Sequence, residues 1–193
     1  LNLSVRAFTD PQQHTLAPFP IYPPFVKSSR FAHRQQLQIP VKLNNQRWVM
    51  DLASAEQQLT GNEKLLMLCN PHNPGGTVYT REELEEQLAF AQRHNLLICS
   101  DEIHCDLLLE PGVKHVPIAS LNDDAAQRSI TLMAPSKTYN IAGLGATIAI
   151  IPNKNLRDRF ITERTGVVPS VDILAYVAAE AAYRDGQEWL NAQ

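Results

Sequence analysis

Two short apolar runs on either side of a helix-length segment are the feature that most constrains this fold. Leu65–Cys69 and Leu96–Cys99 are uninterrupted apolar runs, typical of strands with both faces covered. Between them, Thr80 and Glu83 have the spacing of a capping box, which predicts a helix to about His94. A strand, a helix and a strand within roughly 35 residues predict a βαβ unit, which requires a parallel sheet.

The rest of the chain repeats this mixture of strands and helices. The segment Tyr22–Phe25 contains two prolines and is predicted to be extended, since the residue before a proline disfavours helix. The predicted fold class is α/β, with three αβα layers around a mostly parallel sheet. Further strands are predicted at Thr15–Ile21, Leu37–Leu43, Trp48–Met50, Ile130–Met133 and Thr147–Ile151, and further helices at Leu1–Phe8, Phe25–His33, Asp51–Glu56, Asn155–Thr165 and Val171–Arg184.

Length and composition indicate a globular domain. The 193 residues are 44% hydrophobic and 19% charged, and we expect residues 1–193 to form a single domain with a hydrophobic core. The net charge of −3 gives no electrostatic reason to expect a nucleic acid or an anionic membrane as partner. No apolar run approaches the ~20 residues that span a bilayer.

Three cysteines lie in apolar segments, at Cys69, Cys99 and Cys105. An odd number of apolar cysteines is typical of reduced thiols, so a cytoplasmic location is expected. The first and last segments both resemble parts of helices. We therefore expect a piece of a longer protein.

Lys137 follows the predicted strand Ile130–Met133 after a short Ala-Pro-Ser linker. In open α/β sheets, ligands bind beyond the carboxyl ends of the strands. A partly desolvated amine there would have a lowered pKa, as imine formation requires. Most lysines after strands are solvated loop residues, so this observation alone is weak.

Polar groups follow two more strand ends, at Asn73 and Asp101. Together with Lys137 they suit an aldehyde cofactor that has a pyridinium ring. The lysine would form an imine, the aspartate would pair with the ring nitrogen, and the asparagine would bind the phenolic oxygen. An aromatic residue such as Tyr22 could stack on the ring.

Four segments together resemble the fold-type I pyridoxal 5′-phosphate enzymes, a group that includes the class I and II aminotransferases. These segments are Ile21–Phe25, Asn70–Gly76, Ser100–Leu107 and Ser136–Leu144. Their variants are most similar to the MalY/PatB-type C–S β-lyases, also called cystathionine β-lyases. The resemblance covers nearly the whole chain. It implies the large cofactor-binding domain of such an enzyme, with pyridoxal 5′-phosphate as cofactor.

The resemblance assigns roles by position. Lys137 matches the Schiff-base lysine, Asp101 the partner of the pyridine nitrogen, and Asn73 the partner of the phenolic oxygen. Tyr22 matches the ring-stacking aromatic, and Ser136 a hydroxyl near the phosphate. His104 is a further site residue, and it separates the subgroups of the family.

His104 stands where aminotransferases usually have a tyrosine, and the lyase subgroup has histidine there. Gly145 stands where aminotransferases usually have a phosphate-binding arginine, and Ala134 where many relatives have a serine. The family's phosphate-binding turn and its small domain have no match in this chain. We expect the chain to lack both the N-terminal segment and the C-terminal small domain.

Simpler interpretations exist for each motif. Asn70–Gly76 is also typical of a turn, Asp101 of an N-cap, and His104 of a buried histidine with its hydrogen bonds satisfied. A metal site would need Cys69 and His72 to join the Cys99–Cys105 cluster, and core cysteines are the simpler interpretation.

The resemblance implies cleavage of L-cystathionine or related L-cysteine S-conjugates to a thiol, pyruvate and ammonia. The alternative is an aminotransferase of amino acids, which uses much the same groups. A minor alternative is a non-enzymatic regulator or a fragment that folds without turnover. The implied partners are a small amino-acid substrate and a second subunit, since family members are homodimers.

Overall fold

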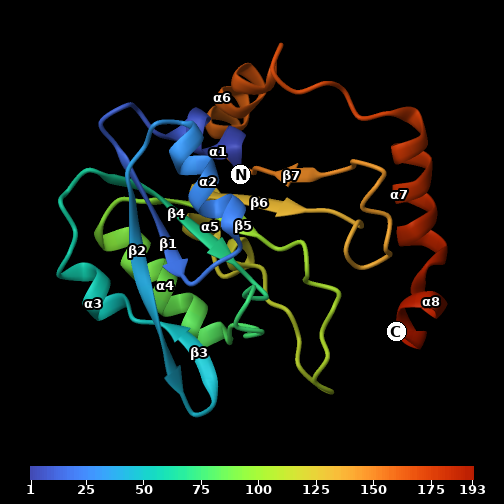
Figure 1. Cartoon of the computed structure of the whole chain (residues 1–193), viewed down its shortest axis with the longest axis horizontal. Coiled ribbons are helices and arrows are strands. Elements are labelled where there is room, and N and C mark those ends of the chain that lie inside the picture. Colours follow the sequence, from blue (N-terminus) through green and yellow to red (C-terminus); the bar gives the residue numbers. More distant parts are fainter.

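The computed structural model describes residues 1–193 and is built around one seven-stranded sheet (Figure 1). The strands are β1 His14–Phe19, β2 Gln36–Asn44, β3 Arg47–Met50, β4 Glu63–Cys69, β5 Leu97–Asp101, β6 Ser129–Met133 and β7 Ile148–Ile150. The helices are α1 Asn2–Phe8, α2 Pro23–Phe31, α3 Leu52–Glu56, α4 Arg81–Arg93, α5 Asp123–Arg128, α6 Lys154–Arg164, α7 Ile173–Asp185 and α8 Gln187–Ala192, with a 3₁₀ turn η1 at Ile118–Ser120.

The sheet is parallel except at its two edges. Its order is β3-β2-β1-β4-β5-β6-β7, and the pairs from β2 to β6 are all parallel. The short strands β3 and β7 pair antiparallel with β2 and β6. The predicted mostly parallel α/β sheet is therefore confirmed.

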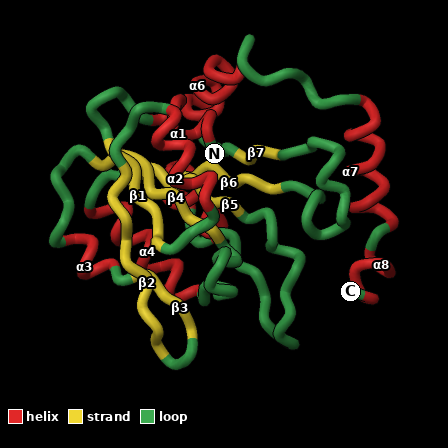
Figure 2. The backbone as a smooth tube through the Cα atoms, viewed as in Figure 1, coloured by secondary structure: helices red, strands yellow, loops and turns green.

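Two hydrophobic cores cover the two faces of the sheet. Leu66 and Leu68 of β4 point into a core with α4, while Leu65, Met67 and Cys69 point into a core with α1, α2 and α6. All five side chains are at most 2% exposed, and each fully buried leucine stabilises the fold by about 1.5–3 kcal/mol. Helices lie on both sides of the strands, so the predicted three layers are present (Figure 2).

The predicted capping box at the start of α4 is confirmed. The Glu83 N–H donates to Thr80 Oγ1 at 3.2 Å, and the Thr80 N–H donates to Glu83 Oε2 at 2.8 Å. These bonds satisfy two N–H groups that have no partner within the helix, so the helix begins at Arg81.

The prediction that Tyr22–Phe25 is extended is wrong, because α2 begins at Pro23. Pro23 and Pro24 occupy the first positions of the helix, where an N–H has no intrahelical partner, so its absence costs nothing. Only Tyr22 keeps a non-helical conformation, as the N-cap. The helices α5 and α8 and the turn η1 were not predicted.

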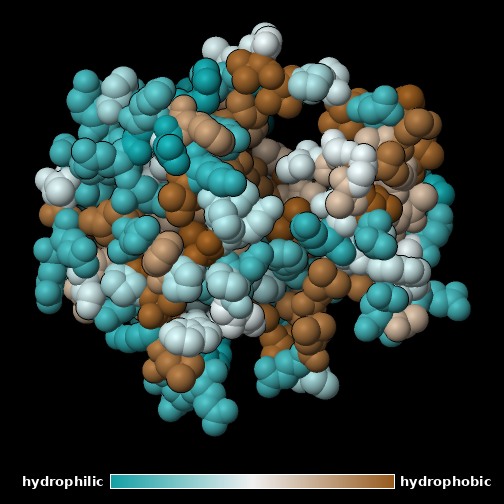
Figure 3. Space-filling model, in the orientation of Figure 1, coloured by the Kyte–Doolittle hydropathy of each residue, from teal (hydrophilic) through white to brown (hydrophobic).

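The C-terminal helices α7 and α8 stand apart from the sheet (Figure 1). Ala175 is the one buried residue of α7, and apolar side chains gather on the surface there (Figure 3). The contact with the rest of the chain includes Tyr183, whose ring meets that of Tyr139 edge-on with centroids 5.7 Å apart. The exposed apolar residues of α7 and α8 are Ile173, Leu174, Tyr176, Val177, Tyr183 and Trp189.

No helix has the length and apolar content needed to cross a bilayer.

Candidate active site

The carboxyl ends of β4, β5 and β6 lie side by side at one edge of the sheet. Cys69 is in register with Asp101, which is in register with Leu132. The Asn70 N–H donates to the Asp101 carbonyl at 3.0 Å, and the Glu102 N–H donates to the Leu132 carbonyl at 2.9 Å. The three segments that carry Asn73, Asp101 and Lys137 therefore start from adjacent positions, as parallel strands predict.

Asp101 is the last residue of β5 and has few hydrogen-bond partners. Its side chain accepts one hydrogen bond, from the Ile103 N–H to Oδ1 at 3.2 Å. Burial raises the pKa of Asp101, and the opposing effect of the Ile103 N–H is weaker. A partly buried carboxylate with unused lone pairs is suited to accept a proton-bearing group from a ligand.

Asn73 and Tyr22 are held together by their main chains. The Tyr22 N–H donates to the Asn73 carbonyl at 3.0 Å. Tyr22 is 45% exposed, so this residue is accessible to a ligand. Asn73 is half-buried, and its side-chain amide forms no hydrogen bond within the protein.

His104 lies within the electrostatic reach of both Asp101 and Lys137. Burial lowers the pKa of His104, the Asp101 charge raises it, and the Lys137 charge lowers it further. His104 and Asn73 both line a cleft of about 890 Å³. Of the predicted site residues, only these two line the cleft; Tyr22, Asp101, Ser136 and Lys137 do not.

Lys137 lies in the turn after β6, where the Tyr139 N–H donates to the Pro135 carbonyl at 2.9 Å. Ser136 is half-buried in this turn, and Lys137 is exposed. The exposure of Lys137 gives no support to a partly desolvated amine, which stays a prediction. The next residue, Thr138, is 1% exposed, and its hydroxyl has no partner in the protein.

The functional groups at this edge fit a pyridoxal-type cofactor. Lys137 provides a free amine, Asp101 an under-paired carboxylate, and Asn73 a free amide. These are the groups that bind an aldehyde, a pyridinium nitrogen and a phenolic oxygen. The unpartnered buried hydroxyl of Thr138 adds a donor beside Lys137.

Residues 1–192 match the family model for aminotransferase class I and II. The chain belongs to this family. Among curated relatives, the chain is 39% identical to "Cystathionine beta-lyase PatB" of Bacillus subtilis, over 99% of this chain and 50% of the relative. It is 30% identical to "Protein MalY" of Escherichia coli, over 97% and 48% respectively. The chain spans about half the length of the curated relatives it matches.

Several solved structures superpose closely on the chain. "Crystal Structure of OvoB" has a TM-score of 0.98 at 66% identity, over 99% of this chain and 50% of that one. The structure of cystalysin from Treponema denticola has a TM-score of 0.93 at 33% identity, over 99% and 49%. That structure contains a pyridoxal 5′-phosphate cofactor.

His72, which the sequence offered only as a possible metal ligand, is a buried histidine. The ring is 2% exposed, neither ring nitrogen has a hydrogen-bond partner, and burial lowers the pKa of His72. A Cβ atom at Gly75 would lie 2.6 Å from His72 Nδ1, so glycine is required for this packing. No group of three His, Cys, Asp or Glu side chains is placed to hold a metal ion.

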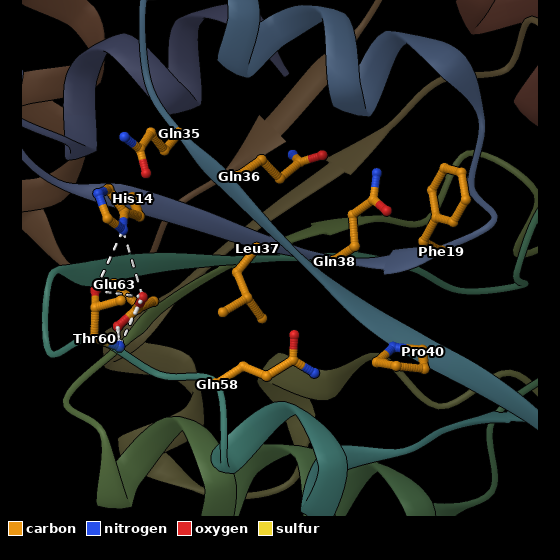
Figure 4. A pocket seen from close by; sticks show the side chains of 10 residues that line it. All are labelled: His14, Phe19, Gln35, Gln36, Leu37, Gln38, Pro40, Gln58, Thr60 and Glu63. Atoms are coloured by element: carbon orange, nitrogen blue, oxygen red, sulfur yellow. Dashed lines mark hydrogen bonds and ion pairs between the residues drawn. The ribbon is translucent and has the colours of Figure 1, made fainter.

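A second cavity, of about 530 Å³, contains none of the predicted site residues (Figure 4). It lies along β1 and β2, and four glutamines contribute to its lining. At one end, Glu63 accepts hydrogen bonds from Thr60 and Gly61 and lies 3.5 Å from His14 Nδ1. Because those lone pairs are already used within the protein, this carboxylate has little capacity for a ligand.

Proposed function

We propose that this chain binds pyridoxal 5′-phosphate and is the cofactor-binding part of a C–S β-lyase. The substrates would be L-cystathionine or related L-cysteine S-conjugates, and the products a thiol, pyruvate and ammonia. The observation that carries the proposal is the under-paired carboxylate of Asp101 at the sheet edge that also carries Lys137 and Asn73. The names of the curated relatives support the choice of reaction.

Each residue has a role set by its chemistry. Lys137 would hold the cofactor covalently and, once released by substrate, take the proton from the substrate Cα. Asp101 would keep a proton on the ring nitrogen, Asn73 would donate to the phenolic oxygen, and Tyr22 would stack on the ring. When bound, the cofactor supplies an electron sink for the charge that develops at Cα.

Ser136 would donate its hydroxyl to the phosphate, as the resemblance implies. His104 would contact the cofactor between Asp101 and Lys137, since both charges act on it. We also propose that residues 1–193 act as one cofactor-binding domain. A homodimer is proposed as well, supported by the apolar surface of α7.

An aminotransferase is the second candidate, supported by the 31% identity to "Alanine aminotransferase" of Mycobacterium bovis. Both reactions begin with removal of the Cα proton by Lys137. In the lyase reaction the β-thiolate then leaves the substrate. In the aminotransferase reaction the thiolate stays, and the proton is returned to the cofactor side instead of to Cα. His104, which matches the lyase subgroup, favours the lyase.

Covalent attachment at Lys137 tests cofactor binding. The protein is mixed with pyridoxal 5′-phosphate, reduced with borohydride and digested, and the labelled peptide is sequenced. We expect one predominant label, on Lys137, that is absent from Lys137→Ala and retained in Lys27→Ala, a control at an exposed lysine of α2. Equal labelling of several surface lysines would contradict the proposed site.

Product analysis separates the two reactions. The full-length protein is incubated with L-cystathionine, and free thiol and pyruvate are measured. Stoichiometric thiol and pyruvate support the lyase. Transfer of the amino group to an added keto acid without thiol release would support the aminotransferase.

A further inference from the structure

Glu102, the residue after Asp101, is a buried carboxylate with a dedicated set of partners. Its side chain is 0% exposed. Ser100 Oγ donates to Glu102 Oε1 at 2.8 Å, and His115 Nε2 lies 2.7 Å from Glu102 Oε2. With Glu102 as the acceptor, His115 donates from Nε2, and its Nδ1 is buried without a partner. None of these contacts has a role in the proposed reaction so far.

The alternation of β5 places this cluster behind Asp101. Successive side chains of a strand point to opposite faces of the sheet. Ile98 belongs to the core on the α4 side, whereas Cys99 belongs to the core on the α1 side. Ser100 therefore follows Ile98 to the α4 side, and Asp101 follows Cys99 to the other. The Ser100–Glu102 hydrogen bond therefore holds the end of β5 on the α4 side of the sheet, opposite to the side on which Asp101 lies.

His115 lies on a segment, residues 113–118, that is tied to the same sheet edge at further points. Asn70 Nδ2 donates to the Val116 carbonyl at 3.4 Å, and the Asn70 N–H donates to the Asp101 carbonyl. Ile118 at the end of the segment is fully buried in the core. The segment is thus fixed directly after His115, at Val116 and Ile118, and these contacts hold the imidazole beside Glu102.

We propose that His115, acting through Glu102, is a positioning residue that aims the Asp101 carboxylate at the cofactor ring nitrogen. The inference rests on the proposed function. Removing one hydrogen-bond partner of a buried carboxylate leaves that carboxylate under-satisfied, so it moves toward water. Because Glu102 is bonded directly to Asp101 along the chain, such a movement would turn the Asp101 side chain away from its acceptor geometry.

The test compares two ligands that differ only at the ring nitrogen. Pyridoxal 5′-phosphate and its 1-deaza analogue, which has a C–H in place of that nitrogen, are titrated into the protein and their dissociation constants are measured. A hydrogen bond to a charged group corresponds to a preference of about ten- to a hundredfold for the nitrogen-containing ring. Asp101→Asn should bring this preference close to one.

His115→Phe should lower the preference at least about threefold, and His115→Gln, which keeps an N–H donor, should restore it. In an Asp101→Asn background, His115→Phe should cause no further change. The matched control is His94→Phe, because His94 Nε2 lies 2.8 Å from Glu56 Oε1 in an exposed pair. The control should keep the full preference.

If His115 has a purely structural role, His115→Phe would weaken the binding of both ligands equally and leave the preference unchanged. This result would overturn the inference about His115 but not the proposed function. No preference in the unmutated protein would overturn the proposed role of Asp101 as well. If His115→Phe fails to fold, as judged by circular dichroism, Ser100→Ala removes the other donor to Glu102 and is judged by the same preference.

Discussion

Glu63 and Asp101 lie at opposite ends of two neighbouring strands, and their carboxylates differ in how many hydrogen bonds they accept from the protein. Glu63 begins β4 and accepts hydrogen bonds from the Thr60 N–H, the Thr60 hydroxyl and the Gly61 N–H. Burial alone would raise its pKa, but these donors outweigh burial, so the pKa of Glu63 is lowered. Asp101 ends β5 with one N–H donor, and burial raises its pKa.

The difference separates a structural carboxylate from one that is available to a ligand. At the amino edge of the sheet, the hydrogen bonds of Glu63 close the turn that leads into β4 (Figure 4). At the carboxyl edge, Asp101 has capacity that the protein itself does not use.

The largest expected effect is on cofactor binding by Asp101→Asn. The concentration of pyridoxal 5′-phosphate for half-saturation should rise about ten- to a hundredfold, because a charged hydrogen bond to the ring is lost. The free energy of unfolding without cofactor should not fall at pH 7, since the ionised side chain is disfavoured by burial. Absorbance titration and urea unfolding measure the two quantities. Lower stability with unchanged cofactor binding would refute the comparison.

Glu63→Ala should show the reverse pattern. We expect the free energy of unfolding to fall by about 2 kcal/mol, because several hydrogen bonds to a charged group are lost, while cofactor binding is unchanged. Urea unfolding measures the change. Glu86→Ala, at an exposed position of α4, is the control and should change stability by less than about 0.5 kcal/mol.

The two carboxylates should affect the pH dependence of stability with opposite signs. The folded-state pKa of Glu63 is below 4.5, so its contribution is full above pH 4.5 and is lost as the pH falls through the folded pKa. The folded-state pKa of Asp101 is above 3.8, so stability is lost as the pH rises from 3.8 through the folded pKa. Unfolding curves of Glu63→Gln and Asp101→Asn across this range should diverge from the unmutated protein in opposite directions.

The smallest expected effect is at Cys69 of β4, which is in register with Asp101 of β5. Burial raises the pKa of Cys69 to about 12, and the Asp101 charge adds to the shift. The thiolate is the reactive form, so iodoacetamide at pH 8 should leave Cys69 unmodified in the folded protein. Mass spectrometry should show modification only after unfolding in urea. Rapid native labelling would mean that this edge opens to solvent.

Sequence patterns predicted the central sheet because its signals are local and mutually consistent. Leu65–Cys69 and Leu96–Cys99 are apolar on both faces, and the capping box of Thr80 fixes the helix between them. Once the strands are parallel, Asn73 and Asp101 must follow strand ends at the same edge. The roles of the site residues stay predictions.

Other features depend on relations that local patterns do not contain. Two rules about proline conflict at Pro23, and the position relative to the helix start decides between them. The exposure of Lys137 depends on how its turn closes. His115 meets Glu102 across a loop of 12 intervening residues, and no spacing rule connects the two.

The hydrogen bond from the Tyr22 N–H to the Asn73 carbonyl joins the first turn of α2 to the loop after β4. Because both atoms belong to the main chain, side-chain replacement leaves the link in place. A small shift of α2 along the sheet would therefore carry the aromatic ring and the amide in the same direction. A substrate that displaces the Tyr22 ring would therefore be expected to displace the Asn73 amide with it.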